Sequence, residues 1–321
     1  MKVLFLSDFT PNKNLVIHQS IELLIEEADY VVFNLEGAVT NESEKLPKQI
    51  LAFKIEEIVG FCKKYGKEKF VIALANNHIF DNGVSGFNFL IEHLNKESIM
   101  FFGTKEKPHI TLNNTLSVLN FVTAETVATY KSKPFLNYLF YKEKNIQQQI
   151  DDLQETDKQL ILYPHWGRDM DKKEFSTYNL KLDSKKWKVF GHHPHVISGV
   201  RKNFIYSLGN TFVPHPYYYK NYPAFSYGLA VLYDCDIKDY SLFETKVHSE
   251  DDYMKKFLLK AKPFLELKEI VKNHGDNFSQ EKKFFLKIFS FNGNLGDYFK
   301  LIILQCMIIF FKLKLKIGKN L

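Results

Sequence analysis

Short apolar runs that each end in a polar side chain recur along this chain and constrain its fold more than any other feature. The run at residues 4–7 ends at Asp8, the run at 31–33 leads into Asn34 and Glu36, and the run at 71–75 leads into Asn77. Continuous apolar runs of about four to eight residues are typical of strands buried on both faces. The expected strands are residues 2–7, 30–34, 69–75, 116–122, 160–163, 188–191, 204–207 and 229–233.

Helical patterns lie between several of these runs, at residues 18–27, 54–64 and 86–95. Alternation of strands and helices predicts an α/β fold in which helices pack against a sheet. The runs at 116–122 and 229–233 indicate a second sheet, so we expect a two-sheet sandwich with flanking helices. From about residue 250 the pattern is mainly helical. We therefore expect a catalytic domain at residues 1–248 and a helical C-terminal extension at 249–321.

The length and composition allow one large globular domain or two smaller ones. The chain has 321 residues, of which 45% are hydrophobic and 25% are charged. Three widely separated cysteines without zinc-finger spacing argue against a disulfide framework and indicate a reducing compartment. The strand-like run that starts the chain lacks the length and cleavage site of a signal peptide. These features predict a cytoplasmic location.

Histidines are concentrated in one part of the chain, where His165, His192, His193 and His195 fall within 31 residues. A His-x-His pair at the end of a strand points both rings to one side, because strand side chains alternate. Neutral imidazoles are ligands for Zn²⁺, Mn²⁺ or Fe. A histidine-rich loop without metal is the alternative for this segment, and His165 next to Trp166 could also be a packed aromatic pair.

The polar residues at the strand ends fit one chemistry when they are taken together. Ligands bind outside the carboxyl ends of strands in open α/β sheets. A carboxylate can bridge two divalent ions, amide oxygens and imidazoles complete their shells, and such a pair of ions can activate a water for attack on a phosphoryl group. Taken singly, Asp8 could be a helix N-cap, Glu36 a solvated loop residue, and Asn76 and Asn77 turn formers.

Five motifs in this order resemble the CapA-like, poly-γ-glutamate capsule synthesis type of the calcineurin-like metallophosphoesterases. They are Asn34-Leu35-Glu36-Gly37, Ala75-Asn76-Asn77-His78-Ile79-Phe80-Asp81-Asn82-Gly83, His165-Trp166-Gly167, Gly191-His192-His193-Pro194-His195-Val196 and Tyr206-Ser207-Leu208-Gly209-Asn210. The resemblance covers roughly residues 1–235. It implies a sandwich of two mixed β-sheets flanked by helices, and two bound divalent ions, Mn, Zn or Fe.

The resemblance also implies a role for each motif residue. Asp8 and His195 would hold one ion, Asn77, His165 and His193 would hold the other, and Glu36 would bridge the two. His78 would be the general acid, with Asp81 orienting it. Arg168, His192 and Asn210 are the residues expected on the substrate side, and Arg168 could bind a phosphate or carboxylate through two hydrogen bonds.

The C-terminal residues carry the net charge of +6. Residues 280–321 contain eight lysines against Glu281 and Asp297, so the rest of the chain is close to neutral and no nucleic-acid partner is expected. Residues 299–311 are almost wholly apolar and too short to span a bilayer, which needs about 20 residues. With the lysines that follow, the segment 299–319 suits an anionic membrane surface at the inner face of the cell membrane. The alternative is a helix packed on the body.

These features predict a metal-dependent hydrolase of the metallophosphoesterase type that serves capsule or cell-envelope polymer biosynthesis. A metal-bridging hydroxide would be the nucleophile. The substrate would be a phosphorylated glycan, a lipid-linked glycan or a capsular polymer such as a polysaccharide. One alternative is a metal-dependent amide hydrolase or transferase acting on poly-γ-glutamate. The other is a non-catalytic metal-bound scaffold in an envelope-polymer assembly complex.

Overall fold

Strand β1 (Lys2–Phe9) explains why this fold needs layers on both sides of its first sheet. Leu4 and Leu6 face one hydrophobic core, whereas Val3 and Phe5 face another. The alternation follows from strand geometry, in which successive side chains point to opposite faces. All four side chains are buried. A strand that is apolar on both faces is stable only between two packed layers.

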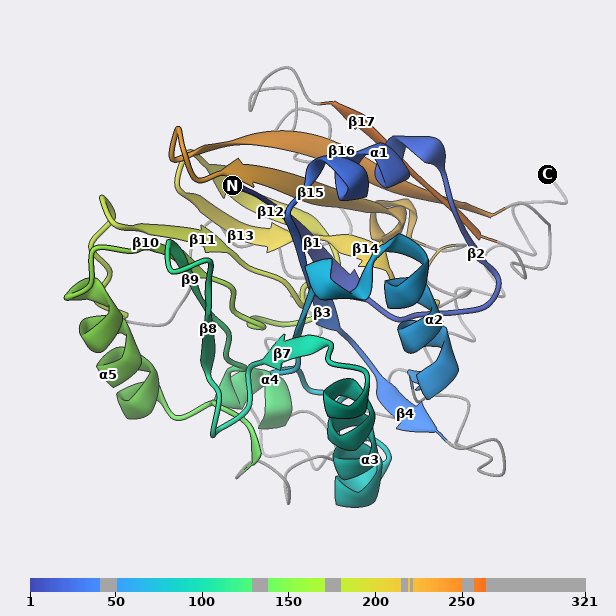
Figure 1. Ribbon diagram of the computed structural model, residues 1–321, viewed down its shortest axis with the longest axis horizontal. Helices are drawn as coiled ribbons and strands as arrows, with labels where there is room; N and C mark the ends of the chain where they lie inside the picture. Colours follow the sequence, from blue (N-terminus) through green and yellow to red (C-terminus); the bar gives the residue numbers. More distant parts are fainter. Residues whose placement is uncertain are drawn as a thin grey trace, which may run out of the picture. The chain divides into compact units, whose positions relative to one another are not determined.

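The computed structural model describes residues 1–40, 51–128, 138–170, 180–214, 219, 222–249 and 257–263 (Figure 1). The chain divides into two units, Met1–Gly275 and Asp276–Leu321, and every described residue belongs to the first. Within the described residues, the helices fall short in length or apolar character of what a membrane-spanning segment requires.

The first sheet contains nine strands among the described residues, in the order β2-β17-β16-β15-β1-β3-β6-β7, with β14 paired to β1 beside this path. Strands β1, β3, β6 and β7 run parallel, whereas β15, β16 and β17 join as antiparallel neighbours. The bounds are β2 (Leu15–Ile17), β3 (Tyr30–Leu35), β6 (Phe70–Ala73), β7 (Met100–Phe102), β14 (Asn210–Phe212), β15 (Tyr227–Asp234), β16 (Asp239–Ser249) and β17 (Phe257–Pro263).

The second sheet is also mixed and has the order β12-β13-β11-β10-β9-β8. Strands β9, β10, β11 and β13 run parallel, and β8 and β12 add antiparallel edges. The bounds are β8 (His109–Leu112), β9 (Leu116–Leu119), β10 (Gln159–Leu162), β11 (Trp187–Phe190), β12 (Ile197–Arg201) and β13 (Phe204–Leu208). A small parallel pair, β4 (Ala38–Thr40) and β5 (Ala52–Lys54), lies apart from both.

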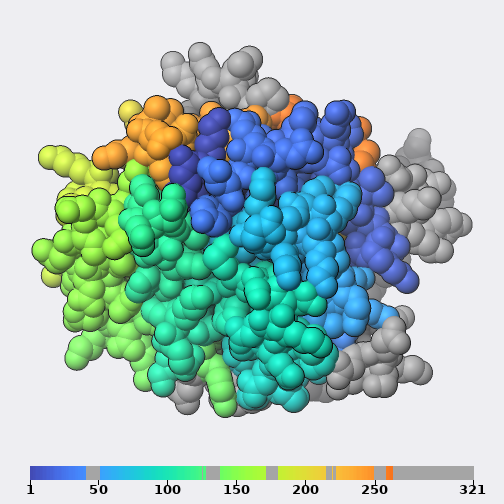
Figure 2. Space-filling model, viewed as in Figure 1, coloured from blue at the N-terminus to red at the C-terminus, as the bar shows by residue number. Residues whose placement is uncertain are grey.

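Three hydrophobic cores hold the layers together. The first lies between the first sheet and the helices α1 (Gln19–Glu27), α2 (Ile55–Tyr65) and α3 (Gly83–Lys96). The second fills the space between the two sheets, and the third packs α5 (Glu143–Gln154) on the outer face of the second sheet. Figure 2 shows the face on which α1 to α3, blue to cyan, adjoin the green residues of β8 and α5. Shorter helices are α4 (Ala124–Ala128) and the 3₁₀ turns Lys67–Lys69 and Pro223–Ser226.

The fold expected from the sequence, two mixed sheets flanked by helices, is confirmed. The strands and helices predicted up to residue 233 form at their expected places. The helical expectation beyond residue 249 is wrong for Phe257–Pro263, which form β17 and pair with β16 and β2. A short apolar run has no periodicity that separates strand from helix, so its pairing partners decide. The rest of the predicted extension, with the apolar, basic segment 299–319, lies outside the described residues.

Candidate metal centre

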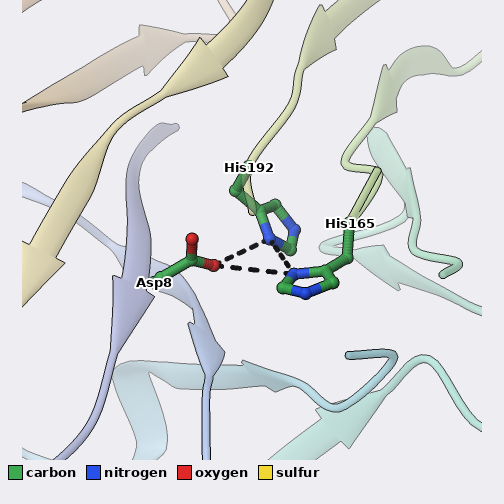
Figure 3. A group of neighbouring side chains, drawn as sticks. All are labelled: Asp8, His165 and His192. Carbon is green, nitrogen blue, oxygen red and sulfur yellow. Dashed lines mark hydrogen bonds and ion pairs between the residues drawn. The ribbon is translucent and has the colours of Figure 1, made fainter. Parts of the chain in front are cut away.

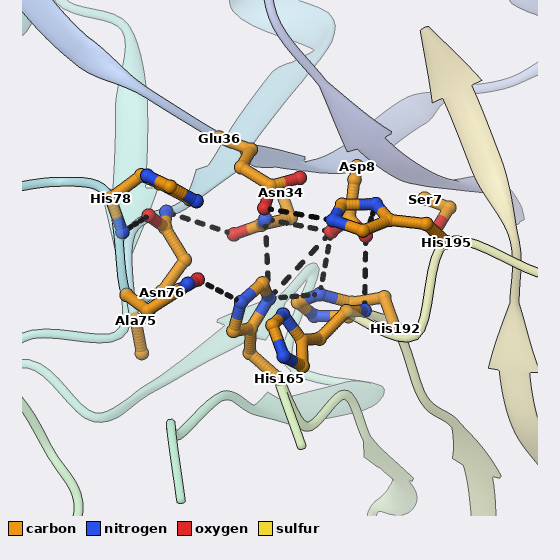
Figure 4. A network of polar contacts seen from close by, with 12 residues as sticks. Ser7, Asp8, Asn34, Glu36, Ala75, Asn76, His78, His165, His192 and His195 are labelled. Carbon is orange, nitrogen blue, oxygen red and sulfur yellow. Dashed lines mark hydrogen bonds and ion pairs between the residues drawn. The ribbon is translucent and has the colours of Figure 1, made fainter. Parts of the chain in front are cut away.

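The side chains predicted to bind metal gather where the carboxyl ends of strands from both sheets meet (Figure 4). From the first sheet, Asp8 lies in β1, Glu36 follows β3, and Asn77 follows β6. From the second sheet, His165 follows β10, and the segment 191–196 follows β11. Parallel strands place their following loops at one edge, which is where α/β sheets bind ligands. The site is therefore assembled by both layers of the sandwich.

Asp8 is fully buried and is held from several sides. Asn34 Nδ2 donates to its Oδ1 at 2.9 Å, the backbone N–H of His193 donates to its Oδ2 at 3.0 Å, and His192 Nδ1 lies 3.0 Å from Oδ1. Burial raises the pKa of this carboxyl, but hydrogen bonds from His165 and His192 outweigh burial and hold the pKa well below its usual range. Asp8 is thus an ionised carboxylate with a fixed orientation, as a metal ligand requires.

Glu36 is fully buried, and both of its carboxylate oxygens lack a hydrogen-bond partner among the described residues. Burial and the neighbouring Asp8 carboxylate raise the pKa of Glu36 well above its usual range. Among the described residues, the ion-pair partner of Glu36 is His195, whose Nε2 lies 3.7 Å from Oε1. A buried carboxylate without compensation costs several kcal/mol. Its environment therefore fits a bound cation, which would compensate the charge.

His165 and His193 present buried imidazoles close to Glu36. His165 Nε2 lies 2.7 Å from Asn77 Oδ1, and the two imidazole centroids are 4.5 Å apart. Burial lowers the pKa of His165 well below its usual range and lowers the pKa of His193 to about 4. Both rings are therefore neutral near pH 7, which is the form that binds a metal ion.

Two sets of ligand atoms share Glu36. One set contains Glu36, His165 and His193, and the other contains Asp8, Glu36 and His195. Within each set the ligand atoms lie within 4.8 Å of one another, a spacing that an ion coordinated at about 2.0–2.2 Å can close. The residues fit two divalent cations, because Glu36 belongs to both sets. Together with Asn77, these are the residues that the resemblance assigns to two ions, and their binding of metal stays a prediction.

The loop after β11 turns its histidines toward the site by an unusual backbone. Strand β11 ends at Phe190, so the strand alternation expected for His193 and His195 is wrong. Both residues instead have positive φ angles, 97° and 59°, which are uncommon for non-glycine residues. Their ring centroids lie 5.7 Å apart. Backbone strain of this kind is concentrated at functional sites.

His78 and Asp81 form a pair at the side of the metal centre. His78 Nδ1 lies 2.7 Å from Asp81 Oδ2, and the backbone N–H of His78 donates to Asn76 Oδ1 at 3.0 Å. A carboxylate only accepts hydrogen bonds, so Nδ1 of His78 is the donor and Nε2 is the nitrogen that can exchange a proton with a ligand. Only 7% of His78 is exposed. The pair has the arrangement of a general acid and the residue that orients it.

The residues predicted on the substrate side fall in different environments. Arg168 is exposed and precedes Asp169, whose Oδ1 lies 3.4 Å from His193 Nε2. Asn210 is fully buried, and its Oδ1 lies 2.7 Å from His195 Nδ1. Arg168 is therefore exposed and close in the chain to the centre, whereas Asn210 contacts a metal-ligand candidate.

His192 is also fully buried and packs behind Asp8 and His165 (Figure 3). Two residues outside the predicted set belong to the same network. Asn34 Nδ2 lies 3.5 Å from His165 Nδ1, in addition to its bond with Asp8, and Asn76 Nδ2 donates to Asn34 Oδ1 at 3.2 Å. The signal for Asn34 was in the sequence, because it stands two residues before Glu36 at a strand end.

The chain is thus a two-sheet sandwich with a candidate two-metal centre. One buried carboxylate, Glu36, belongs to both sets of candidate ligands. The family model described as "Bacterial capsule synthesis protein PGA_cap" matches residues 13–214. The chain belongs to this family.

Two individual proteins illustrate the similarity. The capsule biosynthesis protein CapA of Bacillus anthracis is 26% identical over 218 residues, which cover 60% of this chain and 53% of CapA. The chain thus spans about half the length of this curated relative. The crystal structure of the calcineurin-like phosphoesterase YfkN from Bacillus subtilis is similar with a TM-score of 0.42 and 11% identity, covering 90% of this chain and 98% of that chain.

Proposed function

We propose that this protein is a metal-dependent phosphoesterase-type hydrolase that acts in the synthesis of a capsular or cell-envelope polymer. The observation that carries the proposal is Glu36, a buried carboxylate whose oxygens have no hydrogen-bond partner among the described residues and which belongs to both ligand sets. Two cations would compensate its charge and that of Asp8. The family description and the capsule biosynthesis protein CapA support the connection with a polymer.

Each residue of the centre has a role in this proposal. Two divalent ions, when bound, would supply Lewis acidity toward a phosphoryl oxygen and would lower the pKa of a water molecule. His78, oriented by Asp81, protonates the leaving oxygen. The mixed nitrogen and oxygen ligands suit Mn, Zn and Fe alike. Asp8, Glu36 and His195 would hold one ion, and Glu36, His165 and His193 the other. Asn77, whose Oδ1 lies beside His165 Nε2, would join the second set.

The proposed substrate is a phosphorylated glycan, a lipid-linked glycan or the end of a capsular polymer. Arg168 is exposed beside Asp169 and offers a guanidinium group for a phosphate or carboxylate. We also propose that the protein acts in the cytoplasm, at the inner face of the cell membrane. Support for this location comes from the sequence of residues 299–319 alone, which is apolar and then lysine-rich.

Metal content and phosphatase activity, measured together, test the proposal. We expect about two equivalents of metal per chain and Mn²⁺-dependent hydrolysis of an aryl phosphate monoester or diester. His193→Ala should abolish turnover and remove one ion. His109→Ala is the matched control, since His109 of β8 contacts Gln149 of α5 and lies outside both ligand sets. Turnover that survives in His193→Ala would show that the proposed mechanism is wrong.

The same assay separates the rival functions. Two ions with activity on a γ-glutamyl amide, and none on either phosphate ester, would replace the phosphoesterase by an amide hydrolase. Metal with no turnover on any ester or amide tested would point to a structural role for the ions. A chain that binds no metal would leave only a scaffold in polymer assembly.

A further inference from the structure

His192 stands out because it touches both ligand sets without belonging to the Glu36-centred pair of sites. Its Nδ1 lies 3.0 Å from Asp8 Oδ1 and 2.9 Å from His165 Nδ1 (Figure 3). Asp8 belongs to the set with His195, and His165 belongs to the set with His193. A single imidazole nitrogen thus links one ligand of each proposed ion.

The ring of His192 is itself rigidly held. It is fully buried and packs on Tyr163, with the ring centroids 4.4 Å apart. Its backbone N–H donates to Pro164 O at 2.9 Å, and its carbonyl accepts from the backbone N–H of Trp166 at 3.2 Å. A side chain fixed in this way can orient its neighbours, because it has little freedom to follow them.

Hydrogen bonding, rather than a third ion, accounts for the contacts of His192. A carboxylate only accepts, so the nitrogen facing Asp8 carries the proton and donates. The facing atoms of Asp8, His165 and His192 are therefore already engaged with one another. The oxygens of Glu36 and His192 Nε2 all have no partner among the described residues. The oxygens, however, belong to a carboxylate with no donor on either atom, whereas Nε2 belongs to a ring whose Nδ1 already donates to Asp8. Cations are expected beside the oxygens of Glu36 and not within the His192 group.

Full burial also separates His192 from the substrate side, where the sequence had placed it. None of its surface is exposed. We propose that His192 is a positioning residue that holds Asp8 and His165 in place, so that both ions of the centre depend on it. This inference rests on the two-metal function proposed above. It assigns to His192 an effect on metal affinity at both sites rather than a contact with substrate.

Two substitutions of His192 distinguish the contribution of Nδ1 from that of Nε2. In His192→Asn the amide nitrogen can occupy the place of Nδ1, whereas in His192→Gln the amide reaches the place of Nε2. We expect His192→Gln to weaken Mn²⁺ binding at both sites about 10–100-fold, the usual cost of losing an outer-shell partner. His192→Asn should stay within about threefold of the wild type. Isothermal titration of the full chain with Mn²⁺ gives both affinities.

Asn210→Ala is the matched comparison, because Asn210 Oδ1 lies beside His195 Nδ1 and Asn210 contacts no ligand of the other set in the described residues. It should weaken one ion only. Electronic spectra of the Co²⁺-loaded chain provide a second readout, in which His192→Gln should change the bands of both ions. Circular dichroism of each metal-free variant shows whether it is folded.

The possible outcomes distinguish failure of the role proposed for His192 from failure of the proposed two-metal function. A wild-type chain that does not bind two ions overturns the proposed function and the inference with it. A wild type with two ions and a His192→Gln variant of unchanged affinity overturns the inference alone. Three ions in the wild type and two in His192→Gln would make His192 a ligand. If His192→Gln does not fold, His192→Asn decides: retained ions support the inference, and lost ions in a folded chain overturn it.

Discussion

At the scale of single residues, Glu36 should destabilise the metal-free protein while it contributes to metal binding. Its raised pKa and unpartnered oxygens mean that the metal-free protein carries an unfavourable buried group. Replacing it by methionine keeps the length of the side chain and removes the charge. We expect metal-free Glu36→Met to be about 1–3 kcal/mol more stable than the metal-free wild type, the usual cost of a buried unsatisfied group. Urea unfolding in EDTA measures this difference.

In the presence of metal, the wild type should be more stable than Glu36→Met. A ligand at 100 times its Kd stabilises a folded protein by about 2.7 kcal/mol, so Mn²⁺ should stabilise the wild type and leave Glu36→Met unchanged. Glu244→Met is the matched control, since Glu244 is also buried but pairs with Lys262 at 2.9 Å. That variant should keep its response to metal. A metal-free Glu36→Met that is less stable than the wild type would contradict this account.

The role of His78 leads to a prediction about leaving groups. His78→Ala should lower turnover of an alkyl phosphate about 10²–10⁴-fold, because a poor leaving group needs a proton donor. An aryl phosphate with an acidic phenol should lose much less, since its leaving oxygen needs little protonation. Asp81→Asn should show the same selectivity with a smaller loss. The kcat values for both substrates decide, and equal losses would remove His78 from proton transfer.

The sequence predicted which side chains lie together better than it predicted their contacts. Asp8, Glu36, Asn77, His165, His193 and His195 were all candidates, and the fold brings them together. The packing of His192 behind Asp8 could not be predicted, because it depends on a tertiary contact between the two sheets. The positive φ of His193 and His195 was likewise invisible, since no glycine or asparagine marks the turn.

At the scale of elements, the junction of β11 with its loop depends on Gly191. A Cβ there would lie 2.1 Å from Tyr206 O and 2.5 Å from Trp166 Nε1, which already share a hydrogen bond of 2.8 Å. Gly191→Ala should therefore lower the free energy of unfolding by at least about 1–3 kcal/mol, the usual cost of overpacking. Thermal or urea unfolding of the variant checks the expectation.

Gly60→Ala is the control within the same chain. Gly60 lies inside α2, and a Cβ there would meet nothing within 4 Å. Because alanine is favoured over glycine in a helix, this change should raise stability by about 0.5–1 kcal/mol. Opposite signs for the two glycine substitutions are the expected result. Equal effects on the free energy of unfolding would show that close packing at Gly191 does not destabilise the alanine variant.

Two other elements show where element prediction from sequence stops. The helix α5 was not predicted, although Ile146, Ile150 and Leu153 are spaced to form one buried face, because the polar residues between them hide the pattern. Strand β17 was expected as helix, and its pairing with β16 and β2 decides its structure. In both cases the deciding interaction is with a partner distant in sequence.

At the scale of the whole molecule, the layered architecture was predictable because it depends on short apolar runs that need burial on both faces.

The charge distribution is the second property at this scale, and it leads to a prediction about membranes. The full chain should bind vesicles containing anionic lipid and bind neutral vesicles much more weakly. Each lysine near such a surface contributes about 1 kcal/mol, and added salt should weaken the binding.

Charge reversal in the C-terminal segment tests the membrane proposal on the intact chain. Substituting Lys312, Lys314, Lys316 and Lys319 by glutamate should abolish sedimentation with anionic vesicles, because it replaces attraction by repulsion. The matched control reverses two exposed lysines of the described body, Lys185 and Lys186, and should leave binding nearly unchanged. Hydrolysis of a soluble aryl phosphate should be the same in both variants, since none of the substituted lysines is among the proposed ligands or catalytic residues. Vesicle binding that survives the fourfold reversal would show that residues 299–319 do not provide the membrane contact.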